Sequence, residues 1–129
     1  MALELKYLTW VTVLTALLWV PYILNEIMVR GLADALGYPA NPKPLAPWAQ
    51  RMKAAHYNAV ENLVVFATLI FIGVVAGVHR PAIVSSAYVY FWARAVHVAA
   101  YTFAIPGLRT LAFLVGVGCQ LCIAWHLLF

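Results

Sequence analysis

Apolar residues fill four long stretches of this chain, and shorter segments with polar residues or proline separate them. The stretches cover approximately residues 5–29, 54–78, 81–105 and 108–129. Each is close to the roughly 20 residues that an α-helix needs to cross the hydrocarbon core of a bilayer. The pattern therefore predicts an all-α integral membrane protein, in which one domain over residues 1–129 forms a four-helix, up-down-up-down bundle.

The segments between the stretches contain residues that end helices. Residues 31–50 hold four of the seven prolines and two of the seven glycines, a composition that predicts a surface loop. His79–Pro81 and Ile105–Gly107 predict two tight turns. Pro21 lies inside the first apolar stretch, where it predicts a kink.

The composition agrees with a membrane location. Of the 129 residues, 66% are hydrophobic and only 9% are charged, which leaves too little polar surface to cover a soluble globule of this size. The first stretch has neither a compact basic segment before it nor a small-residue cleavage site after it, so we expect a retained helix. The net charge of +4 does not indicate a nucleic-acid partner, because no basic run is interleaved with aromatic residues.

The basic residues predict an orientation in the membrane. Most of them fall in or beside the first and third connections, as Arg30, Lys43, Arg51, Lys53 and Arg109. The opposite side has only Lys6 and Arg80. By the positive-inside rule, the long first loop of this multi-pass protein is expected in the cytoplasm and both termini on the other side.

Ionisable and amide residues share one helical face within two of the apolar stretches. They are Arg51, Asn58 and Glu61 around the second stretch, and Arg94, His97 and Tyr101 in the third. Spacings of three, four and seven residues bring side chains to the same side of a helix. A charge at bilayer depth costs about 2.5–3.5 kcal/mol on insertion scales, so it is rare without a partner, a water-filled cavity or a ligand. These residues therefore predict a binding site.

Arg109 comes shortly after a Pro-Gly turn, so we expect it in the first turn of the fourth helix. The free backbone N–H groups and the dipole of a helix start already favour an anion. Together with Arg51 and Arg94, Arg109 would set three arginines against the single carboxylate of Glu61. The expected ligand is anionic overall and has at least one ammonium group.

A peptide-like thiol fits this description. A free thiol has a pKa of about 8.5, and a guanidinium at a helix start lowers it, which supplies the thiolate that attacks electrophiles. Arg109 is the candidate for this role. It would act as an electrostatic stabiliser and not as a base, because arginine stays protonated.

These residues resemble the MAPEG family, the membrane-associated proteins in eicosanoid and glutathione metabolism. The resemblance is carried by Arg51-Met-Lys-Ala-Ala-His-Tyr-Asn58-Ala-Val-Glu61-Asn, by Arg94-Ala-Val-His97-Val-Ala-Ala-Tyr101 and by the later Arg109-Thr110. It extends over all four helices. It implies a homotrimer that binds glutathione as co-substrate between subunits near the cytoplasmic face. The implied activity is that of a transferase or peroxidase on a lipophilic small-molecule electrophile.

The resemblance also implies which residues hold glutathione. They are Arg30, Arg51, Asn58, Glu61, Arg94, His97 and Tyr101, with Arg109 as the catalytic stabiliser of the thiolate. One position departs from the family pattern, because Ala54 stands where family members often carry an arginine. Lys53 points about 100° away on a helix and is a poor substitute. We therefore expect weaker binding of glutathione and an unchanged fold.

Other interpretations of the same residues remain open. Glu61 could form a structural ion pair with Arg51 or Arg94. A non-catalytic trimer could use the site to bind a small anion or a lipid headgroup, and a transporter could exchange protons at Glu61, although three arginines oppose cation transport. Cys119 and Cys122 have the spacing of a redox or metal motif, but they lack a second cysteine pair and nearby ligands. We therefore expect no metal site.

Overall fold

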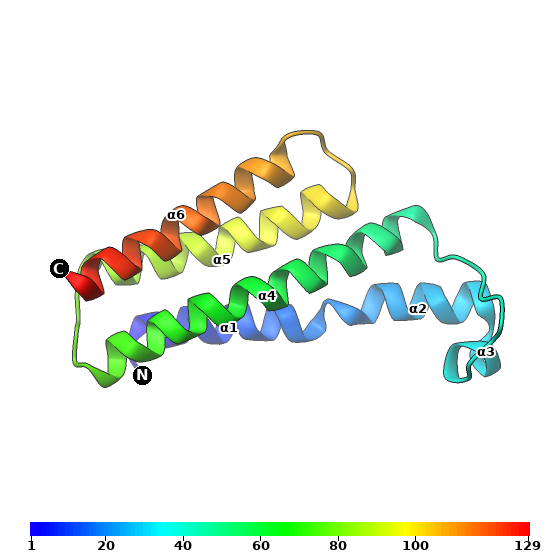
Figure 1. Ribbon diagram of the computed structural model, residues 1–129, viewed down its shortest axis with the longest axis horizontal. Coiled ribbons are helices and arrows are strands. Elements are labelled where there is room, and N and C mark those ends of the chain that lie inside the picture. The colour runs from blue at the N-terminus through cyan, green and yellow to red at the C-terminus, as the bar shows by residue number, and fades with distance from the viewer.

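The structure is a computed structural model that describes all residues from 1 to 129, and it contains helices and no strand. The helices are α1 (Leu3–Leu17), α2 (Trp19–Arg30), α3 (Leu32–Leu36), α4 (Pro47–Val75), α5 (Pro81–Thr102) and α6 (Leu108–Leu128). Helix α2 continues α1 in the same direction, α4, α5 and α6 then alternate in direction, and both chain termini lie at the same end (Figure 1). Helix α5 packs against α1, α4 and α6, so it is the central element of the fold.

The first apolar stretch is broken between α1 and α2, as the position of Pro21 predicts. The break is at Leu18, whose backbone N–H turns back to the carbonyl of Thr15 at 3.4 Å. Pro21 has no backbone N–H, and its ring clashes with the carbonyl four residues earlier, that of Leu17. The expected kink is therefore confirmed.

The predicted first loop over residues 31–50 is too long. Residues 32–36 form α3, and α4 begins at Pro47 and not at residue 54. Proline is well suited to the first turn of a helix because the N–H that it lacks would have no partner there. The side-chain oxygen of Asn25 on α2 accepts the N–H of Ala46 at 3.0 Å, which ties the start of α4 to α2.

The early start of α4 changes the position of two basic residues. Arg51 and Lys53 lie in the first turns of a helix and not in a connection.

The predicted third helix also ends early, because α5 stops at Thr102 and not at residue 105. Just beyond it, Ala104 adopts a φ of 55°, which does not fit an α-helix.

Three helical segments are long and apolar enough to cross a membrane, where the sequence predicts four. They are Leu3–Arg30, which comprises α1 and α2, Pro47–Val75 and Leu108–Leu128. Helix α5 has 22 residues but is not among them, and it contains the buried Arg94 and His97. Many large apolar side chains are exposed, such as Val75 at 86%. Such a surface suits lipid and not water.

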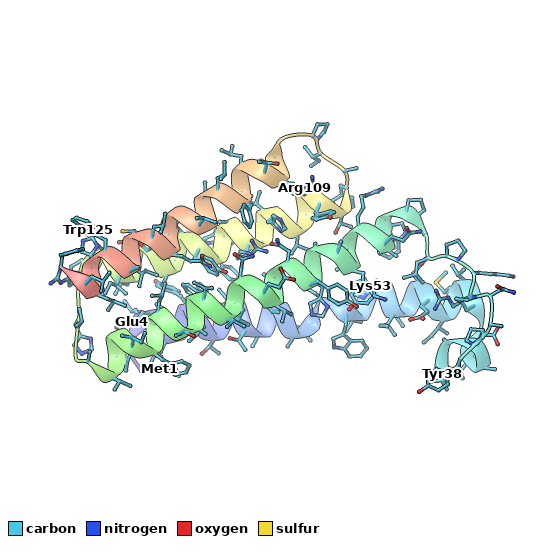
Figure 2. All side chains as sticks on the ribbon, in the orientation of Figure 1. Met1, Glu4, Tyr38, Lys53, Arg109 and Trp125 are labelled. Atoms are coloured by element: carbon cyan, nitrogen blue, oxygen red, sulfur yellow. The ribbon has the colours of Figure 1, made fainter.

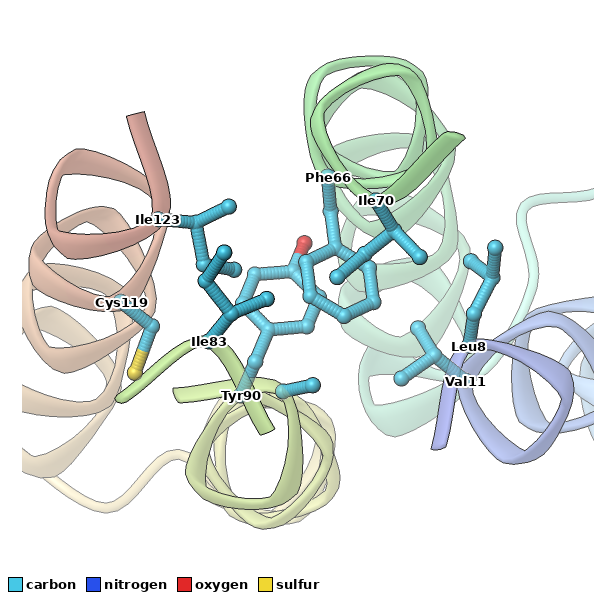
Figure 3. Packing of buried hydrophobic residues seen from close by; sticks show 9 residues of the cluster. Leu8, Val11, Phe66, Ile70, Ile83, Tyr90, Cys119 and Ile123 are labelled. Carbon is cyan, nitrogen blue, oxygen red and sulfur yellow. The ribbon is translucent and has the colours of Figure 1, made fainter. Parts of the chain in front are cut away.

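The core lies where α1, α4, α5 and α6 meet (Figure 3). Its nine buried residues are Leu8, Val11, Phe66, Ile70, Ile83, Ala87, Tyr90, Cys119 and Ile123. The rings of Phe66 and Tyr90 stack with centroids 3.9 Å apart and planes 12° from parallel. Helices in lipid gain little from the hydrophobic effect between them, so close van der Waals packing of this kind holds the bundle together.

We expect the Phe66→Ala substitution to lower the free energy of unfolding by about 3 kcal/mol, because it leaves a cavity between α4 and α5. The shift is measured from unfolding curves of the detergent-solubilised protein. Phe71→Ala is the matched control, since this ring lies on the same helix but is 55% exposed. Equal losses in the two variants would contradict the assignment of Phe66 to the core.

Candidate functional site

Two clefts adjoin near the start of α6. The first has a volume of about 220 Å³, and its wall includes Arg51 of α4 and the turn between α5 and α6. The second has a volume of about 310 Å³, and its wall includes Asn58 and His97. Both clefts are also lined by the same three residues, which are Tyr101, Arg109 and Thr110. The two clefts therefore share one wall, which contains a guanidinium and two hydroxyl groups.

The turn between α5 and α6 places Arg109 at this shared wall. Gly107 precedes α6 with a φ of 77°, a conformation that glycine adopts without strain. Arg109 follows in the first turn of α6, as the sequence predicts, and its Cζ lies 4.5 Å from the centre of the Tyr101 ring. This cation–π contact holds an exposed guanidinium in place. Figure 2 shows Arg109 at the opposite end of the bundle from Met1, Glu4 and Trp125.

Arg51 connects α4 to the same end of α5. Its Nε donates to the backbone carbonyl of Thr102 at 3.0 Å. The last carbonyls of a helix have no partner within the helix, so this bond satisfies one of them and fixes the Arg51 side chain. The rest of its guanidinium is available to the first cleft, which Arg51 lines.

Arg94 lies behind the second cleft and is only 2% exposed. Its Nη2 donates to Asn58 Oδ1 at 2.6 Å and lies 3.4 Å from His97 Nδ1. Hydrogen bonds from a charged donor are short and strong. The buried guanidinium thus joins α4 to α5 and holds two of the residues that line the second cleft.

Three predicted site residues line neither cleft, namely Arg94, which lies behind the second cleft, and Glu61 and Arg30. Glu61 is exposed on α4 and forms no ion pair within the chain, so the alternative interpretation of a structural ion pair with Arg51 or Arg94 is not supported there. Arg30 pairs with Glu26 one turn away and donates from Nε to the carbonyl of Lys43 at 2.7 Å. It fastens the end of α2 to the following loop.

The structure adds two amide residues that the predicted site omits. Asn62 Nδ2 donates to the backbone carbonyl of Asn58 at 2.9 Å and lies 3.3 Å from Asn58 Oδ1. Gln120 Nε2 of α6 donates to the backbone carbonyl of Asn62 at 3.2 Å. Both residues could have been noticed in the sequence as amides within apolar stretches, since a buried amide in a membrane helix needs a partner.

The two cysteines lie apart from this site. Cys119 is buried in the core, and both thiols are free. Cys122 Sγ is 3.8 Å from His126 Nδ1, which also lies 2.9 Å from the Cys122 carbonyl. No group of three or more metal-binding side chains forms here or elsewhere. Neither Cys119 nor Cys122 lines either cleft.

A sequence model of the MAPEG family matches residues 7–129. The chain belongs to the MAPEG family. The match covers nearly the whole chain, which confirms the resemblance carried by the motifs of α4 and α5. No curated protein sequence and no solved structure gives a significant match. MAPEG proteins generally use glutathione, and family membership together with the apolar helices makes this chain an integral membrane protein.

We expect the Asn58→Leu substitution in this MAPEG protein to lower the free energy of unfolding by about 2 kcal/mol, because it leaves a buried charged donor on Arg94 without its acceptor. Unfolding curves in detergent measure the loss. Tyr57→Leu, at the neighbouring exposed position, is expected to change little and serves as the control. Wild-type stability of the Asn58 variant would mean that Arg94 does not depend on this contact.

Proposed function

We propose that this protein is a membrane-embedded, glutathione-dependent enzyme of the transferase or peroxidase type that acts on a lipophilic electrophile. The observation that carries the proposal is the position of Arg109, whose guanidinium lines both clefts at the start of α6. No carboxylate pairs with it within the subunit. Its charge is therefore free to act on a bound anion.

The chemistry follows from a thiolate placed beside Arg109. The guanidinium and the first N–H groups of α6 both favour negative charge there, so bound glutathione ionises more readily than free glutathione. The thiolate sulfur forms a bond to the electrophilic atom of the second substrate, and the group that is displaced takes the electron pair. Arg109 stabilises charge and transfers no proton. Holding the two substrates together adds a further contribution, since proximity alone lowers barriers substantially.

The other cleft residues would hold the peptide part of glutathione. Arg51 suits a carboxylate at the first cleft, and Asn58, His97 and Tyr101 offer polar groups at the second. Ala54, where family members often carry an arginine, provides no such anchor and lines neither cleft. This supports an affinity for glutathione below that of relatives with the arginine.

A homotrimer with four membrane spans in each subunit would explain the exposed position of Glu61. Glu61 is a carboxylate on the outer surface of an apolar helix, where an unpaired charge is costly in lipid. A neighbouring subunit would cover it and would let Glu61 and Arg30 reach glutathione at the interface. In this arrangement the long first connection faces the cytoplasm, the termini face the other side, and the lipophilic substrate arrives through the bilayer.

A second candidate function has support from the first cleft. Two guanidinium groups, those of Arg51 and Arg109, line it without any carboxylate. Such a cleft also suits a small anion or a lipid headgroup held by a non-catalytic trimer. Saturable binding of inorganic phosphate without turnover of any electrophile would favour this function over the enzyme.

We expect Arg109→Ala to lower kcat/KM for glutathione and an activated aryl halide about a hundredfold at neutral pH, the scale of losing one charge-stabilising group. The deficit should shrink as the pH rises toward about 8.5, where free thiols ionise without help. A pH profile of the conjugation rate measures both effects. Arg80→Ala removes the same charge from an exposed site next to α5 and should change neither. Unchanged turnover in the Arg109 variant would remove its assigned role.

We also expect glutathione to bind the detergent-purified protein saturably. The Arg51→Ala substitution should raise the dissociation constant of glutathione about tenfold, which is the scale of one hydrogen bond to a charged group. Isothermal titration calorimetry measures both, again with Arg80→Ala as the charge-matched control. If the wild-type protein takes up no glutathione at millimolar concentration, the small-anion or lipid-headgroup function replaces the enzyme.

A further inference from the structure

A chain of hydrogen bonds behind the second cleft fixes which atoms face the cleft. It begins at the buried Arg94, which contacts Asn58 Oδ1 at 2.6 Å and His97 Nδ1 at 3.4 Å. An arginine guanidinium carries donors only and keeps its proton. The atom of Asn58 beside Arg94 must therefore be the oxygen. By the same reasoning, Nδ1 of His97 accepts, and its proton is on Nε2.

Asn62 holds the amide of Asn58 in the same orientation. A backbone carbonyl can only accept, so the atom of Asn62 that lies 2.9 Å from the carbonyl of Asn58 must be the nitrogen. That nitrogen also faces Asn58 Oδ1 at 3.3 Å. The oxygen of Asn58 thus meets two donors, one from each side. Gln120 ties this part of α4 to α6 through the carbonyl of Asn62.

The remaining nitrogens of these two residues have no partner in the subunit. Neither Asn58 Nδ2 nor His97 Nε2 forms a hydrogen bond, and neither is among the buried side-chain atoms that lack a partner. Both residues line the second cleft, together with Arg109. The cleft therefore presents N–H donors from three side chains, while the hydroxyl groups of Tyr101 and Thr110 can serve as donors or acceptors.

We propose that Arg94 and Asn62 set the hydrogen-bond polarity of the second cleft, so that it selects a ligand group that only accepts, such as a carboxylate, over an isosteric primary amide. Asn62 acts as a positioning residue, since it does not line either cleft. If glutathione is the ligand, as in the proposed function, one of its carboxylates occupies this cleft. A site that orients its own polar groups discriminates strongly, because a mismatched group leaves a donor unpaired.

Hydrogen exchange of the side-chain amides tests the polarity without any ligand. The chain has four asparagines, so selective ¹⁵N labelling gives four side-chain NH₂ signals, each assigned by the substitution that removes it. We expect the NH₂ of Asn58 to exchange with water at least about tenfold faster than that of Asn62, because only the latter is hydrogen-bonded. Slow exchange at Asn58 in the ligand-free protein would overturn the inference.

The Asn62→Asp substitution should set the two orienting residues against each other. A carboxylate at residue 62 offers an acceptor in place of the donor, whereas Arg94 still donates to the oxygen of Asn58, so the amide of Asn58 divides between two orientations and the exchange of its NH₂ slows. Asn41→Asp, the same change at an exposed loop position, should leave the Asn58 signal unaltered. An Asn58 NH₂ that stays in fast exchange in the Asn62 variant would show that Asn62 does not orient it.

Ligand titrations separate this inference from the proposed function. Glutathione should slow the exchange of the Asn58 NH₂ in the wild-type protein, whereas glutathione with both carboxylates converted to primary amides should not. Equal protection by both ligands would overturn the polarity and leave glutathione binding intact. If neither ligand binds, the proposed function fails, and the ligand-free exchange rates of Asn58 and Asn62 still decide the polarity.

Discussion

The buried guanidinium of Arg94 is the constraint on which the site depends. It is 2% exposed in the central helix of an apolar bundle. Arginine stays protonated, so the charge remains even when the side chain is buried. Its neighbours must supply acceptors, and Asn58 and His97 do so for Nη2 at 2.6 and 3.4 Å, whereas the buried Nε has no partner. The bond to Asn58 joins α5 to α4 once packing has turned Asn58 toward Arg94. It also dictates which polar atoms remain free to face the cleft.

The arginines of this protein consequently serve two different purposes. Arg94 is enclosed and organises side chains, whereas Arg51 and Arg109 line clefts and keep guanidinium groups available to a ligand. Arg51 is anchored through a carbonyl at the end of α5, and Arg109 rests on the ring of Tyr101. Neither anchor neutralises the charge. An anion that enters the clefts therefore meets preorganised cations and does not have to compete with a carboxylate.

The surface of the single chain combines exposed apolar side chains with an unpaired charge. Large apolar side chains cover much of it, and the carboxylate of Glu61 stands among them without a partner. Lipid satisfies the apolar groups, but it cannot solvate the carboxylate. Arg94 is paired with Asn58 inside the chain, and by the same reasoning Glu61 needs a polar partner outside it, which supports the proposed site between subunits.

The sequence by itself determined the features that depend on local chemistry. Length and apolarity revealed membrane helices, Pro21 and the Pro-Gly turn marked where helices break, and the spacing of polar residues placed Arg94, His97 and Tyr101 on one stripe. The ends of helices were harder to predict, since the N–H of Ala46 before α4 donates to the side chain of Asn25 on another helix. The family could be recognised from the same motifs, because each motif consists of particular residue types at fixed spacings.

Only the tertiary structure decided which of these residues meet. Asn58 and Glu61 are three positions apart and differ by about 60° around α4, so the sequence could not say which of them faces Arg94. The rotation of α4 is set by packing, in which Phe66 stacks on Tyr90 of α5. That packing turns Asn58 toward Arg94 and leaves Glu61 outside. The role of Gln120 was hidden for the same reason, because a contact across 58 positions depends on how helices pack and not on local periodicity.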